Sequence, residues 1–520
     1  MQGTRIRLLV GGLLLAAVSG TLQAETLQPD PAWQQGKLDN GFKWQVLSTP
    51  QRPSDRVEIR LMVNTGSLME NAQQTGFSHL LPRLAMVHNT ELDPAQQRAL
   101  WQQAMDPGRP LPPAITSYEF TQYNLSLPNN RPDLLKDALA WLAATAGKMT
   151  INEQVVNTAL NSYDPGASWP PNPHDVWWRY RLKGSTLLGH DPAEAPKAPV
   201  DVKQLDSFYK QWYTPDAMTL FVVGNIDSRA LSEQINKAFS PLEGRRETPA
   251  PVPTLTPLST QPVVLVNPAL KQDRLSLIWD TPWQPIRESQ HLIRYWQSDL
   301  AREALFWHVQ RALSDSKAQG VQVGFDCRVL YQRAQCAISV DSSAETLEKN
   351  MLLIARELAN VRDNGLPQME FDALMAQKTT ELNKLFATYA RTDTDVLMSQ
   401  RLRSQQNAVV DIAPEQYQKF RQDFLNSLTL TALNQELRQQ LSQELTMVLM
   451  QPQGEPEANI QALHDSWQKI MAPLPAPVVA TPEEGKPRFL IFLRRSPEMG
   501  RVRENIIALT RSCPVLFLPM

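Results

Sequence analysis

The chain of 520 residues repeats one arrangement of elements on either side of a proline-rich segment, and this repetition restricts its fold more than any other feature. Each set begins with an alternating, strand-like segment, continues with a strand that leads into a helix, and ends with an apolar strand. The matching segments are 56–63 with 274–279, 123–147 with 336–361, and 218–223 with 446–450. Each lies roughly 220 residues after its counterpart, as expected of a duplicated domain. From periodicity alone, the alternative is that common α+β patterns match by accident without any duplication.

We therefore expect an α+β fold of two homologous halves, each a mixed α/β sandwich in which a sheet packs against helices. The segment between them, 241–268, contains Pro249, Pro251 and Pro253 and further prolines at 257 and 262. Such a composition favours extended polyproline conformation and acts as a semi-rigid tether. We place the first domain at 25–240, this Pro-rich linker at 241–268 and the second domain at 269–480.

Residues 1–24 have the composition of a signal peptide. Arg5 and Arg7 precede an apolar run from Leu8 to Val18, and cleavage is predicted after Ala24. The run is too short for a bilayer span, which needs about 20 residues. An uncleaved membrane anchor is the alternative. Export is the prediction, with no membrane span left after processing.

The net charge and the number of cysteines argue against a nucleic-acid-binding protein and against a cysteine-based scaffold. Removal of the leader takes the formal net charge from −2 to −4, and the chain has no long basic run, so no nucleic-acid partner is expected. The cysteines, 3 in number, are too few for a disulfide scaffold or a cysteine-based zinc site. Cys327 and Cys336 lie symmetrically about Tyr331-Gln332 in a predicted hairpin, which would bring them within disulfide reach. Two buried free thiols are the equally open alternative.

Six short motifs occur in one order along the chain. They are Leu38–Phe42, Gly66-Ser67, Thr75–Arg83, Ala114–Tyr123, Phe208–Pro215 and Val222–Asn225. Together they resemble the pitrilysin/insulinase zinc peptidases, the inverzincins, over about residues 38–453. The resemblance implies a clamshell whose halves enclose a peptide-binding chamber. The tail 481–520 lies outside it and has no predicted role.

The resemblance also locates a zinc site that has lost its chemistry. The family motif H-x-x-E-H supplies two zinc ligands and a general base between them. Here His79 keeps the first ligand position, but Pro82 replaces the base and Arg83 the second ligand. The third ligand, a glutamate on a later helix, falls on Ala159. Proline and alanine offer no lone pair to a metal, and arginine stays cationic.

We therefore predict no catalytic residue and no bound metal or other cofactor, with His79 as a vestige. The other histidines lack H-x-x-x-H spacing and are interpreted as packed or surface residues. The family's oxyanion-binding arginine and tyrosine should fall in 313–323, which contains neither. The cluster Trp177, Trp178 and Tyr180 could line a peptide groove, although core packing is the commoner use of aromatic residues at helical spacing.

The sequence thus predicts a degenerate bacterial, periplasmic member of the family that binds a peptide or partner protein. Two alternatives remain. One is a zinc metalloendopeptidase with a rearranged metal site. The other is an accessory subunit of an active paralogue, because some bacterial relatives divide the catalytic residues between two chains.

Overall fold

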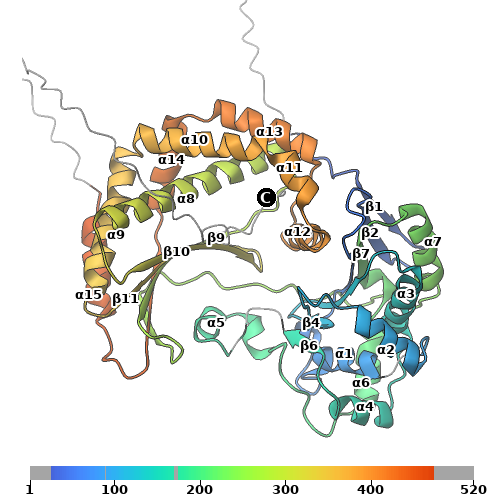
Figure 1. The fold of residues 1–520 in the computed structure, drawn as a ribbon. Helices are drawn as coiled ribbons and strands as arrows, with labels where there is room; N and C mark the ends of the chain where they lie inside the picture. The colour runs from blue at the N-terminus through green and yellow to red at the C-terminus, as the bar shows by residue number, and fades with distance from the viewer. Residues whose placement is uncertain (1–24, 88–89, 169–171, 173, 474–520) are drawn as a thin grey trace, which may run out of the picture.

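The computed structural model describes residues 25–87, 90–168, 172 and 174–473. The predicted leader and the tail 481–520 lie outside these residues. Each half of the chain builds one sheet with helices against it, and the two halves lie side by side (Figure 1). The described residues contain no helix with the length and apolar character needed to cross a membrane.

The first half contains a seven-stranded sheet in the order β1-β2-β7-β3-β5-β4-β6. The strands are β1 (Trp33–Lys37), β2 (Lys43–Ser48), β3 (Val57–Val63), β4 (Ala114–Thr116), β5 (Thr121–Leu127), β6 (Gly166–Ser168) and β7 (Met218–Gly224). Central strand β7 is apolar on both faces. Leu220 and Val222 join the main core of this half, whereas Phe221 and Val223 join a separate cluster on the opposite face.

The helices of the first half pack mainly on one face of this sheet. They are α1 (Phe77–Val87), α2 (Pro94–Gln103), α3 (Pro132–Gly147), α4 (Glu153–Leu160), α5 (Val176–Arg181), α6 (Val202–Trp212) and α7 (Ser228–Phe239), with short 3₁₀ turns η1 (Ser67–Met69), η2 (Thr186–Gly189) and η3 (Pro215–Ala217). Side-chain caps begin several of them. Asn152, for example, accepts a hydrogen bond from the Val155 amide at the start of α4.

The second half contains a five-stranded sheet in the order β10-β11-β9-β12-β8. Its strands are β8 (Val263–Val266), β9 (Asp273–Pro282), β10 (Gln322–Leu330), β11 (Arg333–Ser342) and β12 (Thr446–Gln451). Its helices are α8 (Ser289–Asp315), α9 (Leu347–Asn364), α10 (Gln368–Asn383), α11 (Leu385–Arg391), α12 (Thr394–Gln406), α13 (Pro414–Ser427), α14 (Leu430–Leu441) and α15 (Ile460–Met471).

The strand pairing confirms the predicted duplication. Strands β4-β5-β3-β7-β2 of the first sheet correspond to β10-β11-β9-β12-β8 of the second, and every matched pair has the same relative direction. One strand lies where the sequence predicted linker. Val263–Val266 forms β8, because this apolar, β-branched run follows the last linker proline and pairs parallel with β12.

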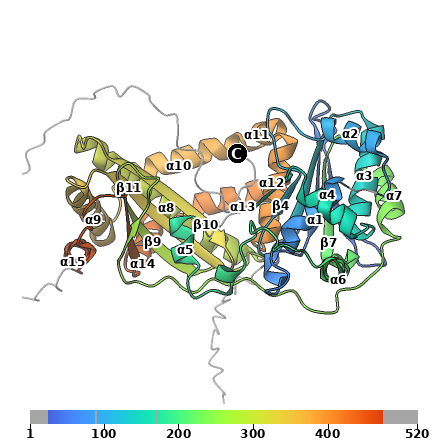
Figure 2. The same ribbon diagram turned by 90° about the horizontal axis from the view of Figure 1, so that it is seen from below.

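The halves meet through packing and buried charge. Helix α12 lies at their junction in both views (Figure 1, Figure 2), and its Leu397 and Met398 pack on Phe221 of the first sheet. Arg181 of α5 reaches Asp280 of β9 at 3.2 Å. The tip of the β10–β11 hairpin also crosses over, where the Tyr331 ring meets Tyr118 edge to face at 6.0 Å.

The aromatic cluster on α5 contributes to this junction. Trp177 packs against Ile278 and Val448 on the face of the second sheet that points away from α8. Trp178 is buried. Of the two interpretations of this cluster, packing between the halves is the one that these contacts support.

Candidate functional site

The helix that carries the degenerate motif, α1, packs on α4, β4 and β6. His79 is 9% exposed, and its Nε2 lies 2.7 Å from Oδ2 of Asp164. The turn before β6 orients that carboxylate, since the Gly166 amide donates to Oδ1 at 2.9 Å. A Cβ at position 166 would lie 3.1 Å from Cε1 of His79, so the imidazole fills the space that the glycine leaves.

Arg83 connects α1 to the end of α4. Its Nη2 donates hydrogen bonds to the carbonyl oxygens of Leu160 at 3.1 Å and Ser162 at 2.8 Å. Carbonyls at a helix C-terminus lack intrahelical partners and carry partial negative charge, so a guanidinium there is stabilising. A metal ion with one ligand on each helix would join α1 to α4. In this chain a cation and two backbone carbonyls join them instead.

The side chains of Ala159 and Pro82 are both buried, so neither position is open to a ligand. Ala159 has no exposed surface, and with Val156 it is one of the two buried residues of α4. Pro82 is buried inside α1, which continues through it to Val87. Proline removes one backbone hydrogen bond, but the packing of α1 on α4, α6, β4, β6 and η1 keeps the helix intact.

Glu70 precedes α1 and caps its first turn, a role that no sequence pattern predicted. Its two carboxylate oxygens accept hydrogen bonds from the amides of Gly76 at 3.0 Å and Ser78 at 2.7 Å. Burial raises the pKa of Glu70 to about 7, although these two amides act in the opposite direction. Both oxygens of this carboxylate are therefore used as a helix cap, which is a structural role.

The residues at this position do not fit a zinc ion. Zinc in a peptidase needs three protein ligands and an open position for water. His79 and Asp164 offer two donors, and the neighbouring Arg83 would repel a dication. Among the described residues, no group of three histidine, cysteine, aspartate or glutamate side chains is placed to hold a metal ion. No catalytic step through zinc follows from this arrangement.

Two other histidines of the described chain pair with carboxylates outside α1. His174 pairs with Asp191 at 2.7 Å, the same distance as in the His79–Asp164 pair. His308 lies between Glu357 and Glu370, at 2.8 Å from each. The first pair joins two nearby loops, and the second set joins α8 to α9 and α10 in the other half. His88, which belongs to the same stretch of sequence as His79, lies outside the described residues.

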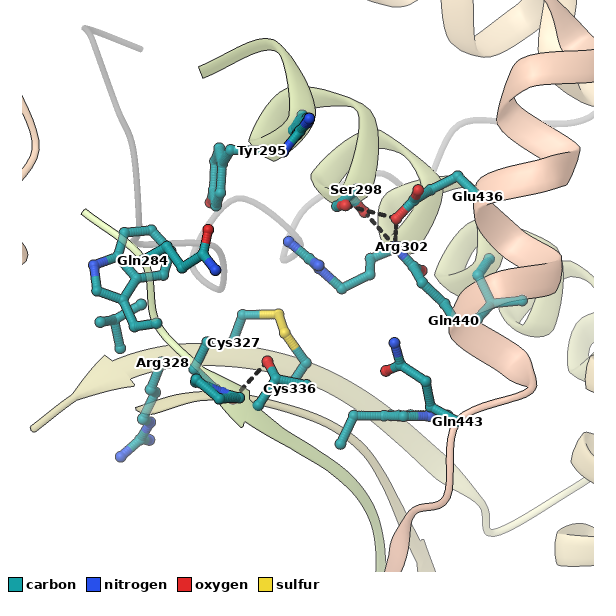
Figure 3. Close-up of a pocket in the computed structure, with 18 of the residues that line it drawn as sticks. Gln284, Tyr295, Ser298, Arg302, Cys327, Arg328, Cys336, Glu436, Gln440 and Gln443 are labelled. Carbon is teal, nitrogen blue, oxygen red and sulfur yellow. Dashed lines mark hydrogen bonds between the residues drawn. A yellow bond between two sulfur atoms is a disulfide. The ribbon is translucent and has the colours of Figure 1, made fainter. Parts of the chain in front are cut away.

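The second half contains a cavity of about 300 Å³ between its sheet, α8 and α14 (Figure 3). Cys327 and Cys336 face each other across β10 and β11 and are joined by a disulfide in its wall. Glu436 closes one corner, where Oε1 accepts from Ser298 Oγ at 2.6 Å and Gln440 Nε2 at 3.0 Å. No pattern in the sequence predicted this cavity, because its lining comes from segments that lie far apart in the chain.

Comparison with known proteins identifies the family of this scaffold. Residues 45–165 match the family described as Insulinase (Peptidase family M16), and residues 199–378 match Peptidase M16 inactive domain. Protein YhjJ of Escherichia coli strain K12 is 64% identical over 473 residues, which cover 91% of this chain and 95% of that protein.

Two solved structures show the same fold. A predicted insulinase family protease from Yersinia pestis has 64% identity and a TM-score of 0.85, over 89% of this chain and 100% of that one. The first half of the periplasmic protease PqqL from Escherichia coli has a TM-score of 0.73 at 18% identity, over 88% of this chain and 100% of that one. The curated PqqL sequence is about twice as long, since the match covers 47% of it.

Proposed function

This chain belongs to the insulinase family of M16 peptidases, and we propose that it is an exported, non-catalytic member that binds a peptide or a partner protein. The observation that carries the proposal is the position of Arg83. Its guanidinium joins α1 to the carbonyls at the end of α4, where a zinc site would need a neutral or anionic donor. A cation in that position opposes metal binding and takes over the structural link.

The two other changed positions support the same conclusion. Pro82 has no group that could activate water, and Ala159 contributes only a methyl group to a closed helix interface. A restored peptidase site would therefore require three new side chains, two zinc ligands and the general base, rather than a small shift of existing ones. A scaffold kept over two complete halves without these residues suits binding better than hydrolysis.

Export to the periplasm has separate support. The predicted leader ends at Ala24, and a disulfide joins Cys327 to Cys336 within the second half. Disulfides persist mainly in oxidising compartments, of which the bacterial periplasm is one. The structural relative PqqL is described as a periplasmic protease. The partner in that compartment could be a peptide or a protein, including an active paralogue.

Metal content and peptide hydrolysis test the proposal together. After dialysis against zinc chloride and then metal-free buffer, the purified chain should retain well under one zinc ion, measured by elemental analysis. Unfolded peptides should remain intact at the rate of a protein-free control. Stoichiometric zinc that a chelator removes, together with chelator-sensitive cleavage, would overturn it.

The His79–Asp164 pair favours one other candidate, a metallopeptidase with a rearranged site. It would use this imidazole and carboxylate with a third donor from the substrate or a partner. In that case His79→Ala should abolish cleavage and zinc retention. His174→Ala is the matched control, because it breaks a histidine–aspartate pair of equal length away from α1. Equal behaviour of the two variants would eliminate this candidate.

A further inference from the structure

The cavity in the second half has the size and lining of a small-molecule site. Its volume of about 300 Å³ lies at the lower end of the range typical of ligand pockets. Its apolar walls include Trp279, Trp283, Tyr295 and Phe325, together with the Cys327–Cys336 disulfide. Such a space accepts one aromatic or branched aliphatic group and little more. It is too small for a folded partner.

Arg302 gives this apolar space a positive charge. Its side chain extends from α8 into the middle of the cavity (Figure 3) and is 21% exposed. The nearest carboxylate that the described residues offer is Asp299, one turn earlier on the same helix, at 3.5 Å. Nε of Arg302 is buried and has no hydrogen-bond partner among those residues.

Glu436 does not neutralise Arg302. Its Oε1 is occupied by Ser298 and Gln440, and no ion pair within 4.0 Å joins it to Arg302 in the described part of the chain. A guanidinium keeps its charge at any physiological pH. Asp299 at 3.5 Å is farther than the roughly 2.7–2.9 Å of a charge-assisted hydrogen bond, so a bound carboxylate closer to this partly desolvated guanidinium would be stabilising.

Two further arginines of the lining add positive charge. Arg294 lies on the same helix as Arg302, and Arg328 lies on β10. Arg328 already contacts Asp326 at 2.7 Å, so it is less available for a ligand. Glu436 is the single acidic residue among those that line the cavity in the described part of the chain. The cavity therefore favours an anion with an apolar body.

We propose that this cavity binds an apolar monocarboxylate, with the carboxylate on Arg302 and the apolar group against Trp279, Trp283 and Phe325. The ligand could be the carboxy-terminal residue of a peptide or a free aromatic acid. The peptide source rests on the proposed peptide-binding function, whereas the free-acid source does not. The cavity lies in the half without α1, so it can be tested independently of zinc.

The test compares acids with their uncharged amides on the wild-type chain. The probes are N-acetylphenylalanine, the peptide Ala-Ala-Ala-Phe and 3-phenylpropanoate, each paired with its carboxamide. Binding is followed by calorimetry and by tryptophan fluorescence, since Trp279 and Trp283 line the site. Each acid that binds should do so at least about tenfold more tightly than its amide, as expected when a charged hydrogen bond is lost.

Variants then test whether Arg302 causes the preference for acids over amides. Arg302→Met should weaken acid binding at least about tenfold and leave amide binding unchanged, and Arg302→Lys should give an intermediate loss. Arg229→Met is the matched control, because this arginine is 91% exposed on α7 in the other half. Tighter binding of the peptide acid would identify a peptide terminus, and tighter binding of 3-phenylpropanoate would identify a free acid.

Three results would overturn the proposal. The first is equal affinity of acids and amides for the wild type, a comparison that needs no variant. The second is unchanged acid binding in a folded Arg302→Met variant. The third is the absence of binding by every acid at millimolar concentration. None of these bears on zinc retention or hydrolysis, so failure here is distinguishable from failure of the non-catalytic assignment.

Discussion

Two arginines, one in each half, show how the surroundings decide what the same side chain does. Arg83 uses its donors on the carbonyls of Leu160 and Ser162 and closes the space where the family binds zinc. Arg302 projects into a cavity and meets one carboxylate, Asp299, at 3.5 Å. Nη2 of the first arginine is fully used by its own chain, although Nε of each arginine has no hydrogen-bond partner among the described residues. The second leaves donor capacity for a ligand, although both halves share one five-stranded plan.

The largest expected effect is a gain in zinc affinity when the family's zinc ligands are restored in the first half. The triple variant Pro82→Glu, Arg83→His and Ala159→Glu should bind zinc about 10³-fold or more tightly than the wild type, because it completes a three-ligand site. Without zinc it should be less stable than the wild type, since the carboxylate introduced at position 159 would be buried without a partner. Competition titration and thermal unfolding with and without zinc measure both effects.

The double variant Pro82→Glu and Arg83→His is the control. It should gain little affinity, because position 159 still lacks a donor. Tight binding in the double variant would show that another residue, with Asp164 as the nearest candidate, supplies the third ligand. Hydrolysis should stay poor even in the triple variant. Segment 313–323 lacks the arginine and tyrosine of the family, and loss of one oxyanion donor typically costs about 10²–10³ in rate.

The contrast between the two arginines predicts different effects on stability. Arg83→Ala should lower the free energy of unfolding by about 2–3 kcal/mol, because two carbonyls lose a charged donor. Arg302→Met should leave stability within about 0.5 kcal/mol of the wild type or raise it, because it removes a poorly paired charge from an apolar wall. Urea denaturation measures both, with Arg229→Ala as the exposed control. If the two substitutions lowered the free energy of unfolding equally, the proposed difference between Arg83 and Arg302 would be wrong.

The sequence predicted the parts of this fold that depend on periodicity. Segments predicted as strands at 56–63, 218–223 and 446–450 correspond to β3, β7 and β12, within one residue at each end. The nearly continuous apolar runs at 218–223 and 446–450 are typical of central strands that are packed on both faces, whereas 56–63 was predicted from its alternation. The motif register also brought Arg83 and Ala159 onto two helices that pack together, α1 and α4.

What the sequence missed depends on contacts between distant segments. Asp164 faces His79 across 85 residues, and an Asp-Pro-Gly sequence before β6 was the single local sign of the turn that orients it. Nothing in the sequence around Arg302 distinguishes it from the other arginines on helices. Its position in an apolar cavity, with Nε unpaired among the described residues, depends on the assembled structure, to which α8, α14 and the sheet all contribute. No pattern within one segment could reveal it.

The smallest predicted effect is a pH dependence of stability that arises at one of the contacts between the two halves. Glu119 follows Tyr118, whose ring meets Tyr331 of the second half, and burial raises the pKa of Glu119 to about 7. The folded chain therefore holds this proton more tightly than the unfolded chain, in which a glutamate titrates near a pKa of about 4.3. Stability from this group is complete below about pH 4 and is lost as the pH rises towards 7.

Glu70, with its pKa raised to about 7, and Asp273, with its pKa raised to about 6, act in the same direction, so the wild type should lose stability between about pH 4 and pH 7. Glu119→Gln should remove part of that loss. We expect the variant to match the wild type at about pH 4 and to exceed it by about 1 kcal/mol at about pH 8, a figure reduced for partial solvent access. Urea denaturation at the two pH values measures the difference. If the variant and the wild type change equally with pH, Glu119 is not protonated at the junction, and the halves are held by packing and by ion pairs such as Arg181–Asp280.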